Sequence, residues 1–112
     1  MVIVDAQSVK NTDSAREKGY DAGKKISGIK RHIAVDTQGL PHAVGITTAN
    51  IGDRNGAIEI FHNYEENLLY VKKVLADGGY TGENFKKATQ KVINATVEVI
   101  KRNELHSFKV VP

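Results

Sequence analysis

The segment 74–82 constrains the fold of this chain more than any other stretch. It reads Val-Leu-Ala-Asp-Gly-Gly-Tyr-Thr-Gly, so three apolar residues lead directly into Asp77 and two glycines follow it. A short apolar run is typical of a buried strand, and paired glycines allow the chain to turn where the strand ends. The sequence therefore predicts a carboxylate at the carboxyl edge of a sheet, where open α/β sheets hold their ligand crevice.

The amino terminus repeats this pattern. Apolar residues 2–4 end at Asp5, and small polar residues follow. Two buried strands that each end in an aspartate predict a pair of carboxylates, the ligand type that divalent cations prefer. Aspartates at strand ends also form turns and cap helices, because their side chains bond nearby backbone amides. The residues alone leave both interpretations open for Asp5 and Asp77.

Composition limits the class of protein. With 112 residues, 40% hydrophobic and 26% charged, the chain is predicted to form one globular domain. It has no cysteine, which excludes disulfides and thiolate metal sites and fits a cytoplasmic location. No apolar run is long enough to cross a membrane. The net charge of +3 favours a polyanionic partner.

Positive charge is concentrated between Lys10 and Arg31, where glycines interrupt the chain and apolar residues are scarce. This composition predicts an exposed basic loop or ribbon that contacts phosphate backbones. An ordinary solvated loop is the alternative for the segment, and an ordinary strand-surface position is the alternative for His32. The candidate DNA-binding residues, of which Tyr20 is a candidate for base stacking, are Lys10, Tyr20, Lys24, Lys25, Lys30, Arg31 and His32.

Hydrophobic spacing predicts alternating strands and helices after the basic segment. Asp36 is expected to form the turn of a hairpin, Asp53 to cap the first helix and Thr81 to cap the second. The chain after the last strand is expected to be irregular. The expected strands cover residues 2–4, 31–36, 41–48, 71–76 and 96–100.

Three strands followed by helix, strand, helix and strand is the order of the ribonuclease H-like fold. The predicted fold class is therefore α/β, with a mixed sheet of about five strands and flanking helices. The first three strands are expected to be antiparallel and the last two parallel.

Six blocks of sequence carry a resemblance to a known family. They are Asp-Ala-Gln-Ser-Val-Lys (5–10), Gly-Tyr-Asp-Ala-Gly-Lys-Lys (19–25), Gly-Ile-Lys-Arg-His-Ile (28–33), Val-Asp-Thr-Gln-Gly-Leu (35–40), Asp-Arg-Asn-Gly-Ala (53–57) and Ala-Asp-Gly-Gly-Tyr-Thr-Gly (76–82). In these blocks the chain resembles the catalytic core of bacterial insertion-sequence transposases of the IS5 type (IS4/IS5 group), within the DDE transposase superfamily.

The resemblance implies a metal-dependent active site. In the family, three acidic residues hold two divalent cations, Mg²⁺ or Mn²⁺, and Asp5 and Asp77 match the first two. The third acid is a glutamate on a helix after the fifth strand, and this sequence has no match for it. Glu98 and Glu104 lack the expected context. Residues 1–112 are therefore expected to be a ribonuclease H-like transposase core that lacks the final catalytic helix and its glutamate.

The implied function is DNA strand cleavage and strand transfer during transposition of an insertion sequence. The implied partners are the DNA of the insertion-sequence ends and target. A homo-oligomer is also expected, because an uncovered apolar sheet face promotes association. With two of three acids, the chain is expected to be inactive alone. The alternatives are a degenerate DNA-binding remnant without catalysis, or another ribonuclease H-like nuclease.

Overall fold

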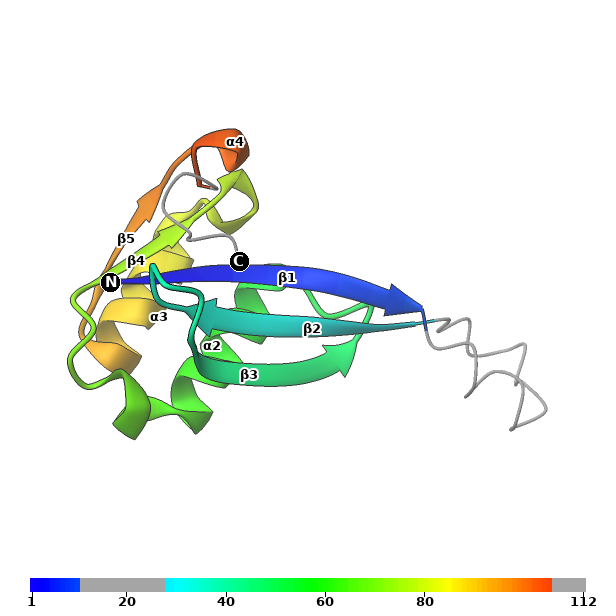
Figure 1. Cartoon of the computed structure of the whole chain (residues 1–112), viewed down its shortest axis with the longest axis horizontal. Helices are drawn as coiled ribbons and strands as arrows, with labels where there is room; N and C mark the ends of the chain where they lie inside the picture. The colour runs from blue at the N-terminus through cyan, green and yellow to red at the C-terminus, as the bar shows by residue number, and fades with distance from the viewer. Residues whose placement is uncertain (11–27, 106–112) are drawn as a thin grey trace.

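Five strands form one mixed sheet in the computed structural model, which describes residues 1–10 and 28–105 (Figure 1). The strand order is β3-β2-β1-β4-β5. β1 pairs antiparallel with β2, β2 pairs antiparallel with β3, and β4 runs parallel to both β1 and β5. This arrangement confirms the predicted ribonuclease H-like α/β fold. The strands are β1 (Val2–Lys10), β2 (Gly28–Val35), β3 (Pro41–Thr48), β4 (Lys73–Ala76) and β5 (Thr96–Val99).

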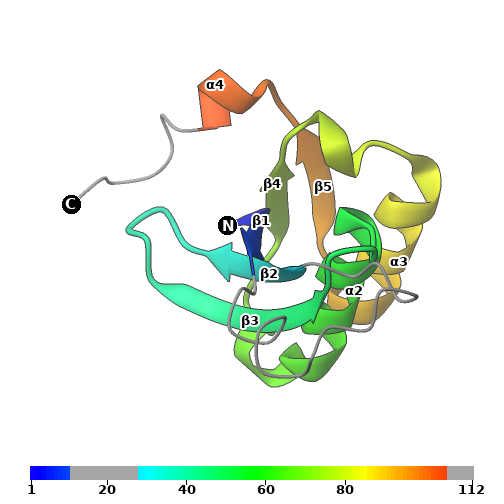
Figure 2. The same cartoon turned by 90° about the vertical axis from the view of Figure 1, so that its right-hand side faces the viewer.

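Two helices cover one face of the sheet. Helix α2 (Asp53–Asn63) and helix α3 (Glu83–Ile93) lie on the same side of the strands (Figure 2). The main hydrophobic core lies between them and the sheet, and it includes Val4, Phe61 and Phe85. None of the helices in the described ranges is both long and apolar enough to cross a membrane.

The opposite face of the sheet carries a smaller apolar cluster. Ile3, Val35 and Leu75 are buried there against Leu105 of the short helix α4 (Arg102–Leu105). Alternation along β1 explains the two clusters, because Val2 and Val4 point toward α2 and α3 while Ile3 points the other way. Two 3₁₀ helices complete the described elements: η1 (Glu65–Leu68) and η2 (Gly78–Tyr80).

The β2–β3 hairpin shows how the sequence forms a local turn. Asp36 Oδ1 accepts hydrogen bonds from the backbone amides of Gln38 and Leu40, and Gly39 has a φ of 85°. His42 Nε2 lies 3.0 Å from Asp36 Oδ2, and this side-chain hydrogen bond is the main reason that the pKa of Asp36 is lowered. The predicted role of Asp36 in the hairpin turn is confirmed.

The strands extend further into the basic segment than predicted. β1 continues to Lys10 and β2 begins at Gly28, and Val9 pairs with Ile29 at this end of the ladder. The basic loop or ribbon predicted between Lys10 and Arg31 is therefore part of the sheet at both ends. The reason is that backbone pairing does not depend on side-chain charge, so charged residues can alternate along a strand. The segment between these ends lies outside the described residues.

The helix starts also differ from the prediction in their caps. Gly52, not Asp53, is the N-cap of α2, and Gly82, not Thr81, is the N-cap of α3. The Thr81 hydroxyl instead donates a hydrogen bond to the Gly78 carbonyl. Both helices thus begin one residue after a glycine, which leaves their first side chains available for other contacts.

Candidate active site

Asp5 and Asp77 lie on neighbouring parallel strands. Val2 of β1 pairs with Val74 of β4, and the next pair is Ile3 with Leu75. The backbone of Asp77 is still extended, with φ −85° and ψ −176°. The same register, continued by two residues, brings Asp5 beside Asp77. Since side chains two residues apart share a face, both aspartates belong to the face of Ile3 and Leu75.

The carboxylate of Asp77 is held in place by two groups, the Gly79 amide and the Arg102 side chain. Asp77 is 8% exposed and its Oδ1 accepts a hydrogen bond of 2.9 Å from the Gly79 amide. This bond caps η2 and requires the turn that the two glycines form. Its Oδ2 lies 3.4 Å from Nη1 of Arg102, which reaches over from α4. Asp77 therefore presents one oxygen toward a cationic partner at the sheet edge.

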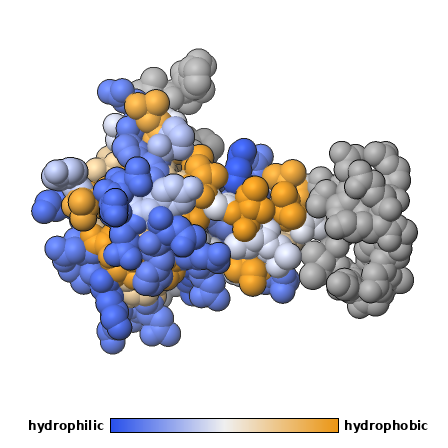
Figure 3. Space-filling view, turned by 90° about the horizontal axis from the view of Figure 1, so that it is seen from below, coloured by the Kyte–Doolittle hydropathy of each residue, from blue (hydrophilic) through white to orange (hydrophobic). Residues whose placement is uncertain are grey.

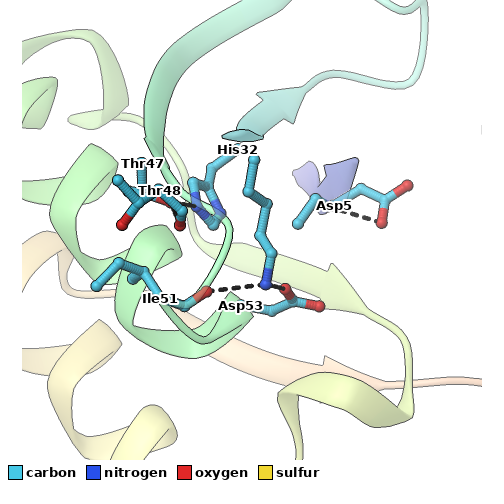
Figure 4. Close-up of polar contacts among 8 residues, drawn as sticks. Asp5, His32, Thr47, Thr48, Ile51 and Asp53 are labelled. Atoms are coloured by element: carbon cyan, nitrogen blue, oxygen red, sulfur yellow. Dashed lines mark hydrogen bonds and ion pairs between the residues drawn. The ribbon is translucent and has the colours of Figure 1, made fainter. Parts of the chain in front are cut away.

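The carboxylate of Asp5 bonds to the backbone of the next residue in the chain. Its Oδ1 accepts a hydrogen bond of 2.8 Å from the Ala6 amide, and the residue is half-buried. In Figure 4 its carboxyl group points away from Asp53. Asp5 thus keeps one oxygen without a partner in the described structure, beside the strand end that carries Asp77.

A third aspartate reaches the same region from α2. Asp53 Oδ1 accepts a 2.9 Å ion-pair hydrogen bond from Lys30 Nζ, which also donates to the carbonyl of Ile51 at 2.8 Å (Figure 4). A Cβ built on Gly79 would lie 3.1 Å from Asp77 Oδ1 and 3.8 Å from Asp53 Oδ2. Asp53 and Asp77 therefore approach the same backbone position from two different elements.

A pocket of about 810 Å³ opens beside Asp53, between the first turns of α2 and α3. Asp53 and Gly79 form one part of its wall, and Arg54 and Asn84 form another. Arg54 Nη1 donates a 2.8 Å hydrogen bond to the Thr81 carbonyl and so links the two helix starts. The pocket gives solvent and small ions access to the Asp53 carboxylate.

The predicted DNA-binding residues fall in different environments. Lys30, Arg31 and His32 lie in β2 rather than in a loop. Arg31 is exposed and its Nη2 donates to Gln7 Oε1 at 2.6 Å. The backbone of Lys10 ends β1. The other candidates, Tyr20, Lys24 and Lys25, lie outside the described residues.

The expectation that His32 lies on the strand surface is wrong. His32 is 0% exposed, its Nε2 lies 2.8 Å from the Thr47 hydroxyl, and its ring packs over Gly56 of α2. Even-numbered residues of β2 face α2, and the glycine leaves room for the ring. Because burial penalises the charged ring, and Lys30 adds to this effect, the pKa of His32 is lowered. A side chain with no exposed surface cannot contact DNA in this conformation.

Sequence reasoning missed two charged partners of the site. Asp53 was expected only to begin a helix, and its ion pair with Lys30 joins residues far apart in the chain. Arg102 was not singled out at all. Asp53 stands in one of the six family-like blocks, which was the available signal for it, whereas nothing in the sequence marks Arg102.

The two glutamates considered as substitutes for a third acid lie elsewhere. Glu98 is on β5 and its Oε1 pairs with Lys73 Nζ at 3.0 Å. Glu104 is exposed on α4, where its Oε1 accepts from the Lys101 amide at 3.4 Å.

Comparison with known protein families shows which family this chain belongs to. The family model described as "Transposase DDE domain" matches residues 1–107. The chain belongs to the transposase DDE domain family. No curated protein and no solved structure gives a significant match.

This DDE transposase domain has hard oxygen donors on Asp5 within β1 and on Asp77 directly after β4. Within residues 1–10 and 28–105, however, no three His, Cys, Asp or Glu side chains are grouped closely enough to hold a metal ion. The donor chemistry of Asp5 and Asp77 fits Mg²⁺ or Mn²⁺, and two carboxylates supply part of the ligand set that such ions take.

Proposed function

We propose that this DDE transposase domain is the catalytic core of a metal-dependent enzyme that cleaves and transfers DNA strands. The observation that carries the proposal is the position of Asp5 and Asp77 on adjacent parallel strands, Asp5 within β1 just past its pairing with β4 and Asp77 directly after the end of β4. Neighbouring strands lie about 4.8 Å apart, so carboxylates in register can share one cation. Six family-like blocks in order favour the IS5-type branch and a bacterial insertion sequence.

The proposed roles of the residues follow from charge and position. Asp5 and Asp77 hold Mg²⁺ or Mn²⁺, which when bound polarises the scissile phosphate and activates the attacking hydroxyl. The Gly79 amide keeps the Asp77 carboxylate oriented. Arg102 balances the charge of Asp77 at 3.4 Å and must be displaced or shared when a cation binds.

We infer that residues 1–112 bind divalent cations weakly and carry out little or no strand transfer alone. Two carboxylates leave most positions of an octahedral ion to water. Among the described residues, no three acidic side chains are grouped closely enough to hold a metal ion, which supports this inference.

The proposed DNA contacts are the exposed Arg31 of β2 together with Lys10, Tyr20, Lys24 and Lys25. These residues are basic or aromatic, and phosphate contacts of this kind give affinity without base identity. Lys30 takes part only through its pairing with Asp53. A DNA-processing enzyme of this type would work in the cytoplasm of a bacterium, on DNA of the insertion-sequence ends and target.

The test measures cation binding first and cleavage second. Mn²⁺ titration followed by water-proton relaxation should give weak saturable binding, lost in Asp5→Asn and in Asp77→Asn. Glu98→Gln, which removes an acid that pairs with Lys73 on β5, should leave binding unchanged. Nicking of supercoiled plasmid should be slow, dependent on Mn²⁺ and absent in both aspartate variants.

The alternatives give different results in the same experiments. A DNA-binding remnant would shift DNA in a gel without binding Mn²⁺ or nicking. A hybrid nuclease would cut RNA–DNA duplexes and spare duplex DNA. Efficient strand transfer by the chain alone would contradict the inference that its cation site is incomplete.

A further inference from the structure

The hydroxyl group of Tyr80 is buried without a hydrogen-bond partner. Tyr80 is 1% exposed, and its ring packs against Phe85 with ring centroids 5.5 Å apart. Within the described residues, no group accepts from or donates to its hydroxyl. Buried phenols normally have a partner, because an unpaired hydroxyl loses its hydration without compensation. The hydroxyl is therefore a donor that the described residues leave unused.

The negative charges of the three aspartates of the site act on this buried tyrosine. Burial raises the pKa of Tyr80 well above its usual range, and the negative charges of Asp53, Asp5 and Asp77 raise it further, with Asp53 the largest of the three. Arg102 acts in the opposite direction. The phenol therefore remains protonated, and its hydroxyl is available as a hydrogen-bond donor.

Of the three aspartates, Asp53 is the least suited to bind the cation directly. Its carboxylate faces Gly79 and Asp77, but its Oδ1 is occupied by Lys30, and the three acids do not form one group that could hold a metal. Mg²⁺ releases its waters reluctantly and keeps several of them when it binds to proteins. A carboxylate near such an ion, but not within direct reach, is suited to accept hydrogen bonds from those waters.

We propose that Asp53 is a positioning residue of the cation site, and that it orders water bound to the divalent cation together with the hydroxyl of Tyr80. The proposal rests on the proposed function, since Asp5 and Asp77 hold the cation. The pocket between α2 and α3 supplies the route by which water reaches Asp53. Lys30 is the counter-ion of Asp53 when no cation is present. The Lys30 and Asp53 side chains are 15% and 39% exposed.

The experiment compares Mn²⁺ affinity, measured by water-proton relaxation, in four variants of the whole chain. Asp53→Asn should weaken Mn²⁺ binding about tenfold, the usual effect of losing an outer hydrogen-bond partner of a metal site. Tyr80→Phe should weaken binding less and should not lower the midpoint of thermal unfolding, because it removes an unpaired polar group. Glu59→Gln removes an exposed acid of the same helix and should leave Mn²⁺ binding unchanged.

Lys30→Met tests whether Asp53 acts on the cation or only stabilises the fold through its ion pair. It breaks the same ion pair as Asp53→Asn but keeps the carboxylate, so Mn²⁺ affinity should be equal to or higher than that of the wild type. Equal losses in Lys30→Met and Asp53→Asn would show that the ion pair acts only on the fold, and would overturn the proposal.

The remaining outcomes distinguish this inference from the proposed function. Wild-type affinity in Asp53→Asn, with binding lost in Asp77→Asn, would overturn the role of Asp53 alone. Unchanged binding in Asp77→Asn, or no binding by the wild type, would overturn the cation site itself and the role of Asp53 with it.

Discussion

His32 fills the space that Gly56 leaves open at the contact between β2 and α2. A Cβ at position 56 would overlap the imidazole ring, and the ring is fully buried and bonded to Thr47. The glycine and the histidine are thus one packing unit, although they come from different elements. At the scale of single residues, this pair decides how closely α2 approaches the sheet.

Gly56→Ala is expected to lower the free energy of unfolding by about 1–3 kcal/mol, the usual cost of overpacking a core. The ring cannot move aside without giving up its bond to Thr47. Urea denaturation measures the effect. Gly78→Ala is the matched control, because a Cβ there meets nothing within 4 Å; equal stability losses in the two variants would contradict the packing argument.

The lowered pKa of His32 predicts a pH dependence of stability. Burial and, to a smaller extent, Lys30 oppose the charged ring, while Asp53 and Glu59 favour it. Since the folded-state pKa lies below the ordinary value of 6.5, the contribution of neutral His32 is complete above pH 6.5 and is lost as the pH falls below it.

The measurement for His32 is the difference in unfolding free energy between about pH 7.5 and about pH 5.5, on either side of the ordinary histidine pKa. His32→Gln should reduce this difference, whereas His62→Gln, at an exposed position, should not. A wild-type difference that persists in His32→Gln would assign the pH dependence to other groups.

At the scale of elements, the end of helix α3 is formed by a residue with an unusual backbone conformation. Helix α3 stops at Asn94, which has φ 54° and ψ 44° and whose amide donates to the Gln90 carbonyl. Only glycine and asparagine adopt this left-handed conformation readily. The chain then enters β5 at Thr96, so this single residue sets the angle between α3 and the last strand.

Asn94→Ala should lower the free energy of unfolding by about 1 kcal/mol, since alanine pays the left-handed penalty without a compensating side-chain bond. Asn94→Gly should be as stable as the wild type or more stable. Chemical denaturation of both variants provides the comparison, and an alanine variant as stable as the glycine variant would rule out backbone strain as the cause.

At the scale of the whole molecule, the sheet is covered unevenly. Helices α2 and α3 protect one face, while Val44 (37% exposed) and Ile46 (63% exposed) lie on the other face of the edge strand β3. In Figure 3 the surface seen from below alternates between hydrophobic and hydrophilic areas. An apolar edge strand is prone to pair with another copy of the chain.

We expect Ile46→Lys to lower the average mass measured by light scattering at high protein concentration. A charge on an exposed edge strand opposes strand pairing. Asn63→Lys adds the same charge at an exposed position of α2 and should leave the mass unchanged. A wild-type chain that stays monomeric at high concentration would contradict the proposed homo-oligomer.

The sequence determined the order of the five strands and two long helices, whereas α4 forms in a stretch that was expected to be irregular. β3 spans the predicted residues because a glycine turn precedes it, and both long helices begin within two residues of the predicted starts. The position of Asp77 directly after β4 also followed from an apolar run that stops at a charge, whereas the strand expected to end at Asp5 continues to Lys10. These features are local: hydrophobic period and turn chemistry act between residues close in the chain.

The tertiary structure alone decided which distant residues meet. The burial of His32 under Gly56, the pairing of Lys30 with Asp53 and the reach of Arg102 to Asp77 each join segments that no local pattern connects. The approach of Asp53 and Asp77 to Gly79 arises in the same way, from a helix start and the residue after a strand. Contact across the sheet depends on strand order and register, and those are fixed by the packing of the whole domain.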